Sequence, residues 1–315
     1  MFKVLVTGGS GFIGRNLIET LLLKNYLVYK AFYDIENRLI DRVEKLNNKE
    51  IEPKTSFENI EKIDLLINCS AKLPEKKNST IDEYRKINVE RTLLTAKQAL
   101  KKGLKRFVHI STALASDFIN EQYVDASNLK KIFSSPRNFY KISKLECENA
   151  LWEFSRKTGL EVVILRPPLV YGKFVKNNFL TLLNLINKKI PLPFKNIKNL
   201  RSYCAVENLV DLITVCMHHP KAPGNSFFVS DNQGISISDL ILKLSNYMQI
   251  TPVFFSLPFN LINLISRFIN SEGLNNIQKD FIVDISNTRK ILNWSPVINL
   301  DQGLEKTVQW YLKNR

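Results

Sequence analysis

The chain has 315 residues, of which 44% are hydrophobic and 24% are charged. This length and composition are typical of a globular protein with a large buried core and argue against a disordered chain. Its net charge of +15 comes from 45 Lys and Arg residues against 30 Asp and Glu residues, and the basic residues are scattered along the chain. We therefore expect no nucleic-acid partner, because a basic surface of this kind suits anionic substrates or an acidic membrane equally well.

The 4 cysteines and 3 histidines have neither the spacing of metal ligands nor that of a disulfide framework. This predicts a protein without a metal site in a reducing compartment, and we expect the cytoplasm. We expect no signal peptide, because the sequence leads directly into its first strand. The apolar segment 253–269 is interrupted by polar residues and falls short of a membrane span of about 20 residues. We interpret it as a packed helix, with peripheral contact to a membrane as the alternative that we do not favour.

Residues 3–14, with the sequence KVLVTGGSGFIG, predict a buried strand, a tight turn and the start of a helix. The apolar run at residues 4–6 is typical of a strand that is covered on both faces. The glycines let the chain turn and let a phosphate approach bare backbone, and the helix over 15–23 directs its N-terminal amides at that phosphate. A strand before and an amphipathic helix after are the context that a dinucleotide fingerprint requires. The predicted cofactor-binding residues of this turn are Gly8, Gly11, Phe12, Ile13 and Gly14.

Strand and helix patterns alternate through the first half of the chain, which predicts an α/β fold with a doubly wound parallel sheet of the Rossmann type. The polar stretch 37–62 predicts a short helix and a weak third strand. Beyond residue 168 the regular alternation ends, which indicates a smaller lobe over the substrate. We therefore divide the chain into a cofactor-binding domain, residues 1–168, and a mainly substrate-binding lobe, residues 169–315, from which the helix over 209–218 returns to the sheet. Further expected strands are 27–33, 63–68, 107–112 and 161–166, and further expected helices are 81–102 and the one that contains residues 140–144.

Asp34 follows the second strand twenty positions after Gly14, where a carboxylate can accept hydrogen bonds from the adenosine ribose. Because of Asp34 we favour NAD as the cofactor. Arg38 can instead meet a 2′-phosphate, so NADP remains the alternative. Ala71 follows the strand 63–68, and small residues there let a loop pass close to the cofactor.

Tyr140 and Lys144 are four positions apart, so both project from one face of a helix. A phenol titrates at about pH 10, and a lysine ammonium beside it favours the phenolate, so the pair predicts an acid/base group. Lys144 can also hydrogen-bond the nicotinamide ribose. Ser111 and Thr112 end a strand at the edge where open sheets bind ligands, so they can hold the hydroxyl or carbonyl of a substrate. The predicted chemistry is proton transfer by Tyr140 coupled to hydride transfer at the nicotinamide.

With these motifs the chain resembles the extended short-chain dehydrogenase/reductase family, in its NAD-dependent sugar-nucleotide epimerase/dehydratase branch. The resemblance covers nearly the whole chain, through TGGSGFIG, INVERT, ISTA, YKISK, RPPLVYGKFVKNNF and RSYCAVENLVDLI. It is similar to the part of that branch that contains UDP-N-acetylhexosamine 4-epimerases and UDP-4-keto-6-deoxy-N-acetylglucosamine 4-reductases, which serve O-antigen and capsule synthesis. The resemblance implies that Tyr140 is the acid/base, Lys144 its partner and Thr112 the catalytic hydroxyl.

The resemblance also implies roles for three residues outside that catalytic set. Asn88 would contact the cofactor, Asn178 would approach the nucleotide-sugar, and Arg201 would pair with its diphosphate, a task that suits a planar bidentate donor. A homodimer is usual in the family.

The favoured hypothesis is an enzyme that acts at C4 of a UDP-linked (N-acetyl)hexosamine, either as a 4-epimerase that keeps its NAD or as a 4-keto reductase that exchanges NAD(P)H. We lean to the reductase, because Asp34 is the only anchor evident for the adenosine end of the cofactor. Reduction of a non-nucleotide ketone, such as a steroid- or flavonoid-like compound, is an alternative against which Arg201 argues. A non-catalytic NAD(P)-binding regulator is another, against which the intact Tyr140 and Lys144 argue.

Overall fold

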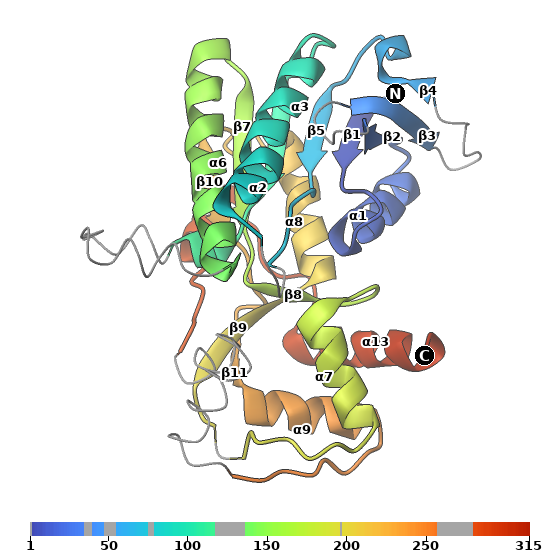
Figure 1. Ribbon diagram of the computed structural model, residues 1–315, viewed down its shortest axis with the longest axis vertical. Helices are drawn as coiled ribbons and strands as arrows, with labels where there is room; N and C mark the ends of the chain where they lie inside the picture. Colours follow the sequence, from blue (N-terminus) through green and yellow to red (C-terminus); the bar gives the residue numbers. More distant parts are fainter. Residues whose placement is uncertain are drawn as a thin grey trace. The chain divides into compact units, whose positions relative to one another are not determined.

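The computed structural model describes residues 2–34, 40–46, 55–74, 79–116, 136–195, 197–256 and 280–315. The chain divides into two compact units (Figure 1). The first unit comprises Met1–Pro167, Val210–Phe228 and Asn287–Trp294, and the second comprises Pro168–Leu209, Val229–Ser286 and Ser295–Arg315. Within the described ranges, no helix combines the length and the apolar character needed to cross a bilayer.

The first unit is built on a sheet in which eight strands are described, in the order β10-β7-β6-β5-β1-β2-β3-β4. All neighbours from β10 to β2 pair in parallel, which confirms the predicted doubly wound sheet. β1, β5, β6 and β7 are almost wholly buried, as expected of strands with helices on both faces. The strands are β1 Lys3–Thr7, β2 Leu27–Tyr33, β3 Ile40–Leu46, β4 Thr55–Ser56, β5 Leu65–Asn68, β6 Arg106–Ile110, β7 Glu161–Arg166 and β10 Asn225–Phe228.

The edge of this sheet differs from the prediction for residues 37–62. Two strands are present there instead of one, and both are antiparallel, β3 to β2 and β4 to β3. A parallel neighbour requires a crossover of about a dozen residues or more, whereas only residues 34–39 connect β2 to β3. The short connection therefore forces a hairpin-like return. Residues 35–39 and 47–54, which include Arg38, lie outside the described residues.

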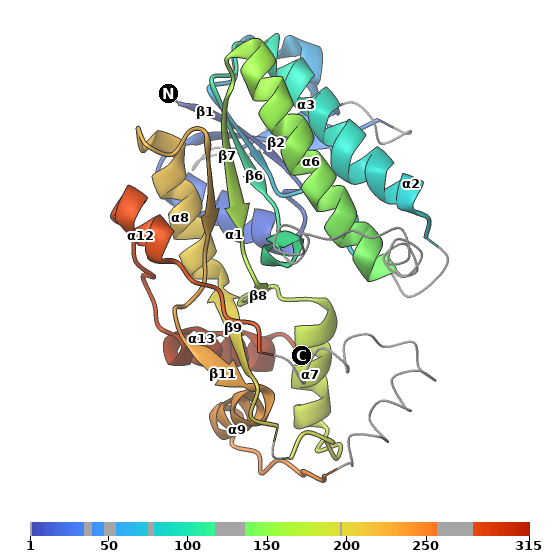
Figure 2. The same ribbon diagram turned by 90° about the vertical axis from the view of Figure 1, so that its left-hand side faces the viewer.

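Helices cover both faces of the sheet, α1 and α8 on one face and α2, α3 and α6 on the other (Figures 1 and 2). The helix predicted over 81–102 consists of α2, a π-helical segment and α3 in succession. Apolar residues of α3 and α6 pack on β1, β5, β6 and β7 to form a continuous core. The helical elements of this unit are α1 Phe12–Leu23, η1 Phe57–Asn59, α2 Ile81–Arg85, the π segment η2 Lys86–Glu90, α3 Arg91–Leu100, η3 Ala113–Ser116, α6 Pro136–Thr158, α8 Val206–His218 and α12 Ser286–Leu292.

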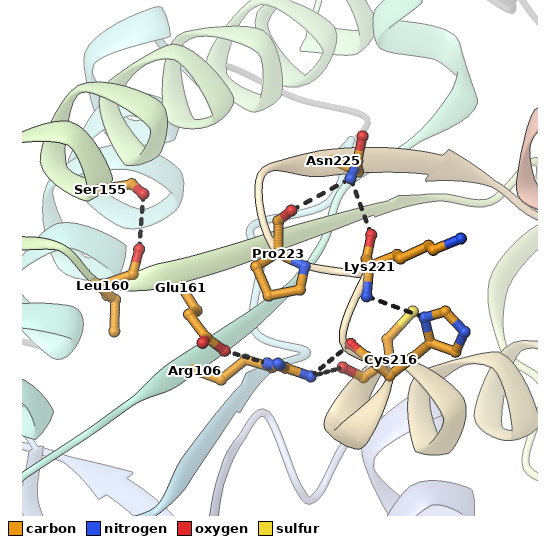
Figure 3. Close-up of polar contacts among 9 residues, drawn as sticks. Arg106, Ser155, Leu160, Glu161, Cys216, Lys221, Pro223 and Asn225 are labelled. Carbon is orange, nitrogen blue, oxygen red and sulfur yellow. Dashed lines mark hydrogen bonds and ion pairs between the residues drawn. The ribbon is translucent and has the colours of Figure 1, made fainter. Parts of the chain in front are cut away.

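The N-terminal ends of β6 and β7 are fixed to the connection between α8 and β10 (Figure 3). Arg106, the first residue of β6, donates from Nε to Glu161 at 2.7 Å and from Nη1 to the carbonyls of Cys216 at 2.9 Å and His219 at 3.2 Å. Asn225 donates two hydrogen bonds to carbonyls of the turn that precedes β10. These contacts hold the end of the sheet opposite to the glycine turn.

The second unit contains a smaller sheet in which three strands are described, in the order β11-β9-β8. The buried carboxylate of Asp231 organises its interior, because it accepts hydrogen bonds from the Tyr171 hydroxyl, the Ala205 amide and Asn208 Nδ2, each at 2.7 Å. Of the apolar segment 253–269, residues 257–269 lie outside the described residues. The elements are β8 Leu169–Tyr171, β9 Leu200–Ala205, β11 Gly234–Ser236, α7 Asn177–Asn187, α9 Ile237–Tyr247 and α13 Leu300–Lys313.

Candidate functional site

The glycine turn joins the C-terminal end of β1 to α1. Gly8 adopts a φ of 67°, and a Cβ atom at this position would lie 2.7 Å from the carbonyl carbon of Cys69. A Cβ atom at Gly14 would clash with the Gly8 oxygen, and the Gly11 amide donates to that same oxygen at 2.9 Å. Side chains at positions 8 and 14 would therefore break the turn. The helix begins at Phe12, so its N-terminal amides lie next to this bare backbone.

A cavity of about 400 Å³ opens over the turn. Three segments line it, the turn itself, the end of β2 and the residues after β5. Its bare backbone at a helix N-terminus and its apolar walls fit the phosphates and the adenosine of a dinucleotide. Of the ten predicted cofactor residues, Gly8, Gly11, Phe12, Ile13 and Ala71 line the cavity, whereas Gly14, Asp34, Asn88, Tyr140 and Lys144 do not. The remaining lining residues are Gly9, Ser10, Ala31, Phe32, Tyr33, Cys69, Ser70 and Leu73.

Arg91, the first residue of α3, supports two walls of the cavity, and the sequence did not point to it. Its guanidinium carbon lies 4.5 Å from the centroid of the Tyr33 ring, and its Nη2 donates to Ser70 Oγ at 2.8 Å. Only 8% of the residue is exposed, and burial lowers the pKa of the guanidinium. Within the described part of the chain Arg91 forms no ion pair, so aromatic stacking and one hydroxyl hold this buried charge.

Asn88 braces the loop after β5 against α6. Its Oδ1 accepts from the Lys72 amide at 2.7 Å, and its Nδ2 donates to the Lys72 carbonyl at 3.2 Å and to Ser143 Oγ at 2.9 Å. These bonds use both ends of the amide. Direct contact of Asn88 with the cofactor stays a prediction, and the structure assigns the side chain a supporting position beside the cofactor loop.

The hydroxyls of Thr112 and Tyr140 come together at the C-terminal end of β6. Thr112 follows β6 and is buried, and its side chain hydrogen-bonds Tyr140 on α6. Burial raises the pKa of Tyr140 to about 12, and the Thr112 hydrogen bond opposes this rise. The structure therefore pairs two hydroxyls that can share one oxygen of a substrate.

Lys144 lies beneath this pair and is 1% exposed. Its Nζ donates to the Ile110 carbonyl at 2.6 Å and lies 3.2 Å from His109 Nε2. Burial lowers the pKa of Lys144, which differs from the prediction that an ammonium here favours the phenolate. Because Lys144 is buried and Tyr140 is half-buried, desolvation favours the neutral amine and the neutral phenol over their charged forms.

Ser111, predicted to bind substrate, hydrogen-bonds the carboxylate of a buried ion pair. Its hydroxyl donates to a carboxylate oxygen of Glu148 on α6. Arg166, the last residue of β7, donates to the same carboxylate from Nη2 at 2.5 Å and from Nε at 3.2 Å. Glu148 is 1% exposed, so the pair fixes α6 to two strand ends next to Thr112. A direct contact of Ser111 with substrate remains a prediction.

Asn178 and Arg201 belong to the second unit. Asn178 is exposed in the first turn of α7. Arg201 lies on β9, and its guanidinium carbon is 5.3 Å from the centroid of the Phe281 ring. The predicted contacts of Asn178 and Arg201 with a sugar nucleotide stay predictions.

The chain is similar to a large group of known proteins. Residues 4–229 match the model of the NAD dependent epimerase/dehydratase family. A UDP-glucose 4-epimerase of Vibrio cholerae is 33% identical over 321 aligned positions, which cover 99% of this chain and 96% of that protein. Among solved structures, UDP-glucuronic acid 4-epimerase from Bacillus cereus, in complex with UDP-glucuronic acid and NAD, matches with a TM-score of 0.73, 21% identity and 100% coverage of both chains. UDP-N-acetylglucosamine 4-epimerase from Bacillus cereus matches with a TM-score of 0.72, 17% identity and coverage of 100% and 98%.

Proposed function

Because the chain belongs to the NAD-dependent epimerase/dehydratase family, we propose that it transfers hydride between its nicotinamide cofactor and C4 of a UDP-linked (N-acetyl)hexosamine. One observation carries this proposal, the hydrogen-bonded hydroxyls of Thr112 and Tyr140 over a buried Lys144 in the unit that holds the glycine cavity. The similarity to a UDP-glucose 4-epimerase supports C4 as the reacting carbon.

The residues of the first unit have distinct tasks in this chemistry. When bound, the nicotinamide supplies the hydride acceptor or donor. Thr112 holds the C4 oxygen of the sugar in place, and Tyr140 removes or returns the proton on that oxygen. The raised pKa of Tyr140 means that the phenol is the resting form, which can donate its proton to a 4-keto oxygen directly but has to lose that proton before it can accept one from a C4 hydroxyl. The walls of the cavity hold the adenosine end of the cofactor. The sugar binds at the C-terminal end of β6, beside Thr112 and Tyr140.

Of the two reactions at C4, we propose 4-epimerisation. The lean toward a 4-keto reductase rested on Asp34 as the only evident anchor for the adenosine end. Arg91, which steadies Tyr33 and Ser70 at the cavity wall, supplies a second support on that side. A firmly held cofactor suits epimerisation, in which hydride leaves C4 and returns to its opposite face without net oxidation.

The test is to incubate the purified protein with UDP-N-acetylglucosamine or UDP-glucose without added cofactor, and to follow the galacto epimer by chromatography and NMR. A parallel reaction contains the 4-keto-6-deoxy derivative of UDP-N-acetylglucosamine with NADH or NADPH. We expect epimer in the first reaction, and the Tyr140→Phe variant is the matched control. Nucleotide oxidation in the second reaction alone would identify a 4-keto reductase. Inactivity in both, with reduction of a steroid-like ketone, would identify a non-nucleotide reductase.

The roles of the second unit and of the assembly belong to the same proposal. Asn178 and Arg201 would contact the sugar nucleotide, and the enzyme would act as a homodimer in the cytoplasm, supplying epimerised amino sugars for O-antigen or capsule synthesis. Light scattering tests the dimer. The sugar composition of surface polysaccharide in a deletion strain tests the place in metabolism.

A further inference from the structure

A chain of hydrogen bonds runs through the interior from β1 to the buried Lys144. Asn68, the last residue of β5, is 1% exposed and stands at its centre. Its Oδ1 accepts from the Ser70 backbone amide at 3.1 Å and from Thr7 Oγ1 at 2.5 Å. A backbone N–H can only donate, so the contact with Ser70 settles which end of the Asn68 amide is the oxygen.

The opposite end of this amide is therefore the NH₂ group. Asn68 Nδ2 donates to Thr92 Oγ1 at 3.1 Å and lies 3.2 Å from Nδ1 of His109 on β6. A neutral imidazole carries one donor and one acceptor nitrogen, so Nδ1 has to be the acceptor and Nε2 has to carry the proton. The imidazole is wholly buried, and burial holds the pKa of His109 well below its ordinary value, which keeps the ring neutral.

The protonated Nε2 of His109 faces Lys144 Nζ at 3.2 Å, with Cys147 Sγ as a more distant neighbour at 3.7 Å. An ammonium has three donors and no acceptor, so it would meet this N–H donor to donor. A neutral amine can accept from His109 and still donate to the Ile110 carbonyl, which lies 2.6 Å from Nζ. We propose that His109, locked in its Nε2–H tautomer by Asn68, is a positioning residue that holds Lys144 as the free amine in the resting site.

The charged and titratable groups around Lys144 do not offset this arrangement. Cys69 after β5 and Cys147 on α6 have pKa values that burial raises to about 12, so both are thiols near neutral pH. Glu148 favours a charged Lys144, but Arg166 and Ser111 already take both of its oxygens. A neutral Lys144 lends no positive charge to Tyr140, so the phenol is retained to higher pH. Ser70 both fixes Asn68 and lines the cavity, so the hydrogen bonds that end at Lys144 begin at the cavity wall.

The tautomer can be tested without any enzymatic reaction. The chain has only 3 histidines, so protein with ¹⁵N-labelled histidine gives three imidazole patterns in long-range ¹H–¹⁵N spectra. Spectra of His218→Gln and His219→Gln assign His109 by elimination. We expect the Nε2–H tautomer in the cofactor-free protein at pH 7–8 and its reversal to Nδ1–H in Asn68→Asp, because a carboxylate can only accept from Nδ1. An Nδ1–H tautomer or an imidazolium in the wild-type protein would overturn the proposal.

A neutral Lys144 should raise the pH at which Tyr140 loses its proton. This consequence rests on the proposed function, and the pH dependence of C4 oxidation measures it. In Asn68→Asp the reversed His109 accepts from a charged Lys144, so the rising limb of kcat/KM should move to lower pH by about one unit or more. Thr7→Val is the matched control, because it removes one bond to Asn68 and leaves the one from Ser70, so its limb should stay in place. His109→Gln, whose amide can turn its oxygen toward Lys144, should shift the limb in the same direction if Asn68→Asp does not fold. If the variants turn over more slowly at every pH but the rising limb of kcat/KM does not move, His109 has only a packing role. If the wild-type protein shows no turnover at all, the proposed function is disproved, and the tautomer test still decides the proposal for His109.

Discussion

The guanidinium of Arg91 is stacked on the ring of Tyr33, 4.5 Å from its centroid, and Tyr33 in turn lines the cavity over the glycine turn. The pairing joins the end of β2 to the start of α3, two elements that flank the expected adenosine position. A planar cation on an aromatic face loses little freedom when a ligand binds, so this wall is already in place for the cofactor.

Arg91→Ala should weaken binding of NAD and NADP by about tenfold, since it removes one stacking contact and one hydrogen bond that hold Tyr33 and Ser70. Isothermal titration calorimetry measures the change. Arg85→Ala is the matched control, because Arg85 lies on α2 and pairs with Glu146, away from the cavity lining. Equal affinities of wild type and Arg91→Ala would remove Arg91 from the cofactor site.

Tyr140→Phe removes only the phenolic oxygen. We expect cofactor affinity to persist while turnover falls by about 10²–10⁴-fold, the usual contribution of a general acid/base group. Tyr247→Phe, which removes a hydroxyl on α9 in the second unit, should leave turnover unchanged. Steady-state kinetics with whichever UDP-sugar the wild-type protein turns over provide the comparison, and near-normal turnover of Tyr140→Phe would disprove the acid/base role.

Arg201→Ala tests the diphosphate contact. Loss of a charge-assisted hydrogen bond should weaken UDP and UDP-sugar binding alike by about 1.5–3 kcal/mol. Arg289→Ala, which removes an exposed arginine on α12, controls for the change in net charge. Calorimetry with free UDP gives the result, and an unchanged UDP affinity in Arg201→Ala would favour a substrate without a diphosphate.

Cys69 should react slowly with alkylating reagents although it lines the cavity. Burial raises the pKa of its thiol from 9.0 to about 12, so the reactive thiolate is about a thousandfold rarer at pH 8 than for an unperturbed thiol. Because the pKa is raised, the rate should increase about tenfold per pH unit until the pH approaches 12. Mass spectrometry after iodoacetamide treatment follows the modification, with Cys69→Ser as the control. Fast labelling at pH 8, or labelling that bound NAD does not slow, would contradict a protonated, half-buried thiol beside the cofactor.

Glu148→Ala should lower the free energy of unfolding by about 3–5 kcal/mol, since it leaves the guanidinium of Arg166 without its buried partner. Glu153→Ala on the same helix is the matched control. Its carboxylate forms an exposed pair with Lys157, which water and salt screen, so no measurable loss of stability is expected. Urea denaturation at pH 7 compares the two variants, and similar losses for both would show that the buried pair is dispensable.

The parts of the site that the sequence predicted depend on local spacing. The glycine turn follows a strand and begins a helix, and Tyr140 and Lys144 are neighbours on one helix face whatever the rest of the chain does. The parallel sheet could also be predicted, because its strands are short apolar segments that alternate with helical patterns. The antiparallel edge could not be predicted, because β3 carries only a sparse apolar pattern, with Ile40, Val43 and Leu46 buried.

The missed residues depend on contacts between distant positions. His109 lies 35 residues from Lys144 and 41 from Asn68, and the spacing of the histidines in the sequence bears only on metal binding. Arg91 lies 21 residues from Ser70 and resembled any other arginine of a basic helix. A buried polar residue inside an apolar strand, such as His109 in Arg106–Ile110, was the one signal that pointed to an interior network.

The return of Val210–Phe228 to the first unit has a consequence for dividing the protein. A fragment that ends at Pro167 would lack β10, so β7 would become an open edge with unpaired amides and carbonyls, and α8 would no longer cover its face of the sheet. Such a fragment should aggregate rather than fold. Pro168–Leu209 and Val229–Ser286 are thus insertions into a Rossmann scaffold, and Ser295–Arg315 follows it, so exchanging the second unit for that of a relative requires five splice points instead of a single crossover.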